Sequence, residues 1–204
     1  TSGLGAIKST GAGTSEICVF CHTPHSAKAD APLWNKSISS ASYNVYTSDV
    51  LSQLGGGSYP AAETPAAGAP HVKTRICLSC HDGTIALGSL VNMPSGVSTI
   101  PMQGTGADYK MPQTAAGYIG LDLRDDHPVA IIHDSTKDNE LKSTVTGSVY
   151  LYDNAVVKTQ TGTGTGYVEC TSCHNAHDNQ YGNFLVDSNS QSGICRSCHQ
   201  KTGF

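Results

Sequence analysis

The sequence predicts a single domain over residues 1–204 that is mostly irregular coil, with a few short helices and one small β-hairpin. Leu, Ile, Val and Phe make up only about 19% of the chain, while Gly, Ser and Thr supply nearly a third. Only 14% of the residues are charged and the net charge is −4, so self-repulsion does not explain this shortage of apolar side chains. Such a chain buries too little side-chain surface to offset its ordering entropy. We therefore expect something other than its own side chains to form the core.

All eight cysteines belong to one repeated pattern, C-x-x-C-H. The four copies are Cys18-Val19-Phe20-Cys21-His22, Cys77-Leu78-Ser79-Cys80-His81, Cys170-Thr171-Ser172-Cys173-His174 and Cys195-Arg196-Ser197-Cys198-His199. This is the attachment signature of c-type haem, in which two thiols bond covalently to the vinyl groups and the adjacent His approaches the iron. Four disulfides or two Cys₄ zinc sites would also use eight cysteines, but neither needs a His directly after each pair.

The pattern therefore predicts four covalently bound haem c groups. The eight cysteines are the expected attachment points, and His22, His81, His174 and His199 are the expected proximal iron ligands. Burying each macrocycle contributes on the order of 10–20 kcal/mol gross, at about 25 cal/mol per Å². Four of them can replace a conventional core, and we expect the chain without haem to be largely unfolded.

Five histidines remain as candidates for the second axial position: His25, His71, His127, His133 and His177. Four suffice if every iron takes two imidazoles. His25 and His177 each lie three residues after a proximal His, about 4.5 Å along the axis of a helical turn. Two ligands of one iron approach from opposite sides, so each of these residues must serve a different, adjacent haem. We expect His25 to ligate the haem of the second motif and His177 that of the fourth.

The other candidates carry weaker signals. His127 precedes Pro128, which stiffens the chain, and follows Asp126, which could orient the ring, so His127 is predicted to be a ligand; a solvated acidic turn is the alternative. Spacing does not separate His71 from His133, and each could be a ligand or an exposed His. Met93, Met102 and Met111 could also ligate iron, although the supply of histidines makes this unnecessary.

The motifs also organise the chain. A C-x-x-C-H-x-x-H motif followed by a plain C-x-x-C-H motif occurs twice, which predicts two haem-pair units with motifs at 18–81 and 170–199. Helices are expected at the motifs. Residues 1–17 are expected to be extended, 55–70 and 93–117 to be loops, and 161–166 a flexible connector. Residues 149–152 and 156–157 predict a hairpin with a turn at 153–154.

Charge and motif content exclude several functions. There are 12 Lys and Arg against 16 Asp and Glu, with no basic cluster to bind nucleic acid. No apolar run is long enough to span a bilayer. If every iron is six-coordinate, no position is open for a substrate, and the chain has no C-x-x-C-K motif. We therefore predict an electron carrier rather than an enzyme; a reductase with one five-coordinate haem is the alternative.

The motifs quoted above, with residues 17–25, 32–35, 77–83 and 126–129, resemble the multihaem c-type cytochromes with doubled C-x-x-C-H motifs. Within that group the chain is similar to the OmcE-type tetrahaem cytochromes, which polymerise into extracellular filaments. The resemblance implies export as a secreted precursor and a homopolymeric filament at the cell surface. It implies long-range electron transfer through four bis-histidine haems to redox partners and extracellular acceptors. A soluble periplasmic tetrahaem electron shuttle is the alternative.

The resemblance also bears on the ligands. His25, His127 and His177 match positions that ligate iron in this family. Relatives often carry a further distal His near the N-terminus, and residues 1–16 contain none. The resemblance therefore implies that His71 or His133 is donated to a haem of a neighbouring subunit.

Overall fold

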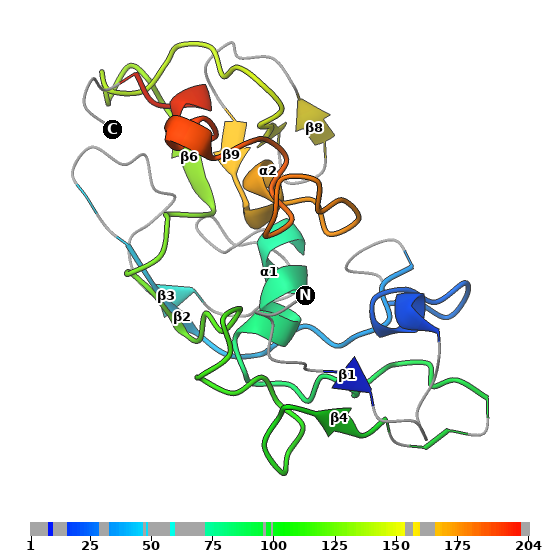
Figure 1. The fold of residues 1–204 in the computed structure, drawn as a ribbon. Coiled ribbons are helices and arrows are strands. Elements are labelled where there is room, and N and C mark those ends of the chain that lie inside the picture. The colour runs from blue at the N-terminus through cyan, green and yellow to red at the C-terminus, as the bar shows by residue number, and fades with distance from the viewer. Residues whose placement is uncertain are drawn as a thin grey trace. The chain divides into compact units, whose positions relative to one another are not determined.

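Short elements joined by long irregular segments make up this computed structural model (Figure 1). It describes residues 8–9, 16–28, 33–46, 48, 58–59, 72–95, 97–98, 100–153, 157–159 and 166–200. The coil-rich composition predicted from the sequence is confirmed. In the described part of the chain, no helix has both the length and the apolar character that a membrane crossing requires.

The chain folds as two compact units, each built from several segments. The first comprises Thr1–Tyr43, Pro60–Glu63 and Arg75–Leu123, and the second comprises Asn44–Tyr59, Thr64–Thr74 and Arg124–Phe204. The first two motifs fall in the first unit and the last two in the second. Each unit therefore holds one of the two motif pairs that the repeat marks.

The first unit contains little regular structure. Its elements are β1 (Lys8–Ser9), the 3₁₀ turn η1 (Ile17–Phe20), α1 (Val72–His81) from Arg75 onward, β4 (Met102–Gln103) and β5 (Asp122–Leu123). β1 and β4 pair antiparallel, with Lys8 opposite Gln103. Residues 1–17 were expected to be extended, and Lys8–Ser9 within them forms a strand. The segments 55–70 and 93–117 were expected to be loops, but each contains a two-residue strand, β3 (Ser58–Tyr59) and β4 respectively.

The second unit contains most of the strands. Its elements are β2 (Tyr43–Val45) from Asn44 onward, β3 (Ser58–Tyr59), β6 (Ile131–His133), β7 (Leu151–Asp153), β8 (Val157–Thr159), β9 (Gly166–Val168), α2 (Cys170–Cys173), η2 (Ser190–Ser192) and η3 (Cys195–Ser197). Three of the predicted helical motifs are short turns, η1, α2 and η3, whereas α1 begins well before its motif. η2 is a turn that the sequence did not predict.

The predicted hairpin is present and forms part of a larger sheet. β7 and β8 pair antiparallel, with Leu151 opposite Thr159 and Asp153 opposite Val157. Asp153, predicted to lie in the turn, is instead the last residue of β7, and residues 154–156 lie outside the described residues. The sheet order is β6-β9-β7-β8. β9 begins at the end of the predicted connector and leads directly into the third motif.

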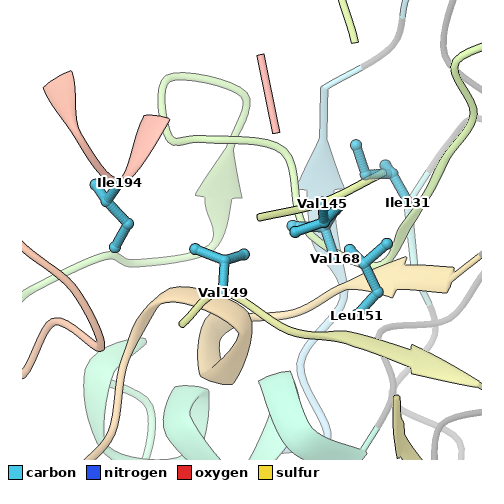
Figure 2. Close-up of a cluster of buried hydrophobic side chains, with 6 residues drawn as sticks. All are labelled: Ile131, Val145, Val149, Leu151, Val168 and Ile194. Atoms are coloured by element: carbon cyan, nitrogen blue, oxygen red, sulfur yellow. The ribbon is translucent and has the colours of Figure 1, made fainter. Parts of the chain in front are cut away.

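A small apolar cluster packs against this sheet. Its buried members are Ile131, Val145, Val149, Leu151, Val168 and Ile194 (Figure 2). Cys173 and Cys198, one from each motif of this unit, pack against the cluster. The side-chain core thus ends at the cysteines of the third and fourth motifs, which is where the haem groups are expected to continue it.

Candidate haem-binding sites

One local geometry recurs at the motifs. The backbone N–H of the motif histidine donates to the carbonyl of the first cysteine in three of the four. The bonds are His22 to Cys18 at 2.8 Å, His174 to Cys170 at 3.0 Å and His199 to Cys195 at 3.0 Å. The second motif forms the C-terminal end of α1. Each motif therefore forms one helical turn, which brings its two cysteine sulfurs and its imidazole close together in space.

The eight cysteines are all free thiols. The structure therefore contains none of the four disulfides that the sequence left as an alternative. Within the described residues, no three or more His, Cys, Asp or Glu side chains are grouped so that they could hold a metal ion.

Hydrogen bonds fix the protonation of two proximal histidines. The Nδ1 of His81 lies 2.5 Å from the carbonyl oxygen of Gly117, and that of His174 lies 2.9 Å from the carbonyl of Asn183. A carbonyl only accepts, so each Nδ1 carries a proton, and in the neutral ring Nε2 is then the nitrogen with the lone pair. That is the tautomer that binds a metal through Nε2, with the ring held by its second hydrogen bond. These residues therefore fit a haem iron.

Gly117 has a steric reason to be glycine. A Cβ at this position would lie 3.3 Å from both Cε1 and Nδ1 of the His81 ring. That is closer than ordinary van der Waals contact, so a side chain here would crowd the imidazole and disturb the hydrogen bond that orients it. The sequence did not single out Gly117, because nothing in its spacing from the motif marks it.

Buried polar side chains hold the first and third motifs. In the first unit, the side-chain Nδ2 of Asn35 donates to the carbonyl of Val19 at 2.8 Å, and its backbone N–H donates to that of Cys21 at 2.9 Å. In the second unit, the Thr74 hydroxyl donates to the Glu169 carboxylate and accepts from the backbone N–H of Cys170. Asn35 and Glu169 are almost completely buried. The sequence did not predict that either residue supports a motif, because neither has a spacing from the cysteines that would mark it.

The structure places four of the five candidate second ligands, since His71 lies outside the described residues. His25 and His177 are exposed. The backbone around His25 is nevertheless held, because its carbonyl accepts from the Thr23 hydroxyl at 3.0 Å and from Asn92 Nδ2 at 3.1 Å. The backbone N–H of His177 donates to Asn175 Oδ1 at 3.1 Å.

His127 lies beside a proximal ligand. The imidazole centroids of His127 and His199 are 6.4 Å apart, with the ring planes at 77°. Two nitrogens on opposite sides of one metal ion at about 2 Å each bring their rings to roughly this separation. His127 Nδ1 donates to the carbonyl of Pro128 at 2.9 Å, which leaves its Nε2 free to ligate. Burial and then the charge of His127 lower the pKa of His199, which favours the neutral, ligating form.

His133 is the buried member of the set. It is only 2% exposed, and neither ring nitrogen makes a hydrogen bond of normal geometry. Burial lowers its pKa, and the nearby backbone of Cys198 partly offsets this effect. A buried neutral imidazole without a hydrogen bond is energetically unfavourable, at about 1–3 kcal/mol. A bound metal would satisfy the ring, so His133 also fits a ligand role beside the fourth motif.

The sulfurs of neighbouring motifs influence each other. Burial and then the charge of Cys80 raise the pKa of the Cys21 thiol. In the second unit, burial and then Cys195 raise the pKa of Cys173 to about 11, and burial and then Cys173 raise that of Cys198 to about 11. Such effects require proximity. The two attachment sites of each unit therefore lie close together.

One comparison with known proteins bears on this arrangement. A family model described as a doubled CXXCH motif matches residues 164–204, which contain the third and fourth motifs. The match supports a multihaem c-type cytochrome. It covers about a fifth of the chain. No curated protein matches the sequence. The CXXCH motifs indicate covalently bound c-type haem, and the match supports a role in electron transfer.

Proposed function

We propose that this cytochrome carries four bis-histidine haems and conducts electrons along them as the subunit of an extracellular homopolymeric filament. The observation that carries the haem assignment is the repeated motif turn, together with the hydrogen bonds that leave Nε2 of His81 and His174 free. Haem supplies one-electron exchange at its iron. The chain positions the macrocycles, orients the ligands and excludes water.

The arrangement of motifs supports electron hopping within each unit. The pKa effects between Cys21 and Cys80, and between Cys173 and Cys198, support neighbouring attachment sites, and Cys173 and Cys198 pack against the same apolar cluster. Haems held at neighbouring sites are close enough to exchange electrons. Polymerisation would extend such a series from one subunit to the next, which is the property expected of a filament cytochrome.

The burial of His133 bears on which histidine reaches a neighbouring subunit. A ring that is 2% exposed is poorly placed to enter another copy of the chain. We therefore assign His133 to its own chain and His71 to a haem of the neighbouring subunit. For the fourth motif we propose His127 as the second ligand in place of His177, because His127 lies beside His199.

Iron analysis and electron microscopy of the matured protein test this proposal. We expect four iron atoms per chain, a low-spin spectrum and filaments in negative stain. His71→Ala should abolish filaments and leave one haem able to bind CO, whereas His133→Ala should keep the filaments. A monomeric protein with four low-spin haems would instead favour the periplasmic shuttle. Binding of cyanide or CO by the unmodified protein would favour a reductase.

A further inference from the structure

The Lys36 side chain is completely buried in the first unit, with 0% exposure. Its Nζ donates to three backbone carbonyls, those of Ala86, Leu87 and Ser89, each at 3.1 Å. An ammonium has three N–H bonds and can donate one to each carbonyl, whereas a neutral amine has only two. Burial lowers the pKa of Lys36, and hydrogen bonds to three carbonyls favour the charged form against this effect. The carbonyls are neutral dipoles. They solvate the charge without cancelling it.

The surroundings of this charge are connected to both of the first two motifs. Asn35, the preceding residue, is bonded through its backbone N–H to the carbonyl of Cys21 and through its side chain to that of Val19. The three carbonyls follow α1, which carries the second motif.

We propose that Lys36 is a fixed positive charge that raises the reduction potentials of the haems at the first and second motifs. The inference rests on the proposed function only in that haems occupy these two motifs. Reduction adds one electron and no proton at each iron, so it lowers the local positive charge by one. A nearby cation stabilises the reduced form, and does so most strongly where burial keeps the effective dielectric low.

Three other ionisable side chains are buried among the described residues of this unit: Tyr43, Arg75 and Asp82. Both charged residues act on Tyr43: burial and then Asp82 raise the pKa of Tyr43, whereas the charge of Arg75 lowers it. Asp82 directly follows the ligand His81 and should shift the potential in the opposite direction to Lys36. The reciprocal variant Asp82→Asn is therefore predicted to raise the potential.

Redox titration of the intact cytochrome tests this role. Lys36→Gln keeps two of the three donors and removes the charge, and Lys36→Arg keeps the charge. For Lys36→Gln, we expect the equilibrium constant for reduction of the affected haems to fall at least tenfold, about 59 mV for one electron. The reduction potentials of the Lys36→Arg variant should stay near the wild-type values. Lys28→Met, which removes an exposed lysine of the same unit, is the matched control and should change the potentials far less than Lys36→Gln does.

Iron content, the low-spin spectrum and filament formation are measured on the same samples. If these are normal and Lys36→Gln leaves every potential unchanged, Lys36 is only structural and the inference is wrong, while the proposed function stands. Equal shifts in Lys36→Arg and Lys36→Gln would also overturn it. Should Lys36→Gln fail to mature, Asp82→Asn decides: a raised potential supports control by buried charge here, and an unchanged one contradicts it.

Discussion

The imidazole rings of His127 and His199 lie edge to face, with 6.4 Å between their centroids and 77° between their planes, although 72 positions separate the two residues in the chain. This pair links an acidic turn before β6 to the last motif. Sequence spacing pointed to His177 for that position. If His127 completes the coordination of the fourth motif's iron, its loss must open one coordination site.

The first prediction concerns that site. His127→Ala should create one high-spin haem per chain that binds CO, because one imidazole is lost. In the same background, replacing Cys195 and Cys198 with Ser should remove that CO-binding haem. The measurements are CO difference spectra and iron content. For comparison, His177→Ala should leave the haem of the fourth motif low-spin. Persistence of CO binding after the fourth motif is removed would show that His127 serves another haem.

His133 yields a second prediction. Its ring is buried and its lowered pKa keeps it neutral, the form that binds iron. We expect His133→Leu, which keeps an apolar side chain of similar size, to produce a CO-binding haem as completely as His133→Ala does. A structural imidazole would behave differently. In that case the haems of both variants would stay low-spin, and the His133→Leu variant would unfold at a higher temperature than the His133→Ala variant.

The third prediction concerns Tyr43, which is 1% exposed and donates its hydroxyl to Asp82 Oδ2 at 2.6 Å. Burial and then this bond raise the pKa of Tyr43 well above its ordinary value. A raised folded-state pKa stabilises the protein fully below the unfolded pKa of about 10, and the contribution is lost as pH rises above it. Tyr43→Phe should lower the free energy of unfolding by about 2 kcal/mol at pH 7.

The pH dependence separates this effect from simple packing. The difference between wild type and Tyr43→Phe should shrink above pH 10, in denaturant titrations followed by circular dichroism. Tyr181→Phe, at an exposed tyrosine, should change stability little at any pH. A Tyr43→Phe difference that stays constant to pH 11 would rule out the hydrogen bond to Asp82 as its source.

The fourth prediction concerns the apolar cluster. Leu151 is 5% exposed and lies in β7 against the other cluster members. Leu151→Ala should lower the free energy of unfolding by about 2–5 kcal/mol, because it removes buried methyl groups and leaves a cavity. Leu121→Ala, at a 39% exposed leucine, should change it by less than about 1 kcal/mol. Similar losses in both variants would show that the cluster contributes little beside the haems.

Local sequence was most informative where chemistry depends on close neighbours. The cysteines and histidine of each motif lie within five residues, so one helical turn brings them together, as the bond from His174 to Cys170 shows. The hairpin was predictable for the same reason, since β7 and β8 are near each other in the chain. By contrast, β6 and β9 pair across more than 30 residues, and nothing in their short sequences marks that partnership.

The motifs, their fourfold repetition and the shortage of apolar side chains follow from the sequence alone, because covalent attachment needs particular residues at particular short spacings. The neighbours of those motifs were decided by tertiary structure: His127 beside His199, His133 in the interior, and Lys36 enclosed by three carbonyls. Ligand pairing and buried charge depend on distances between segments remote in the chain. Those distances are set only when the segments pack together and exclude water.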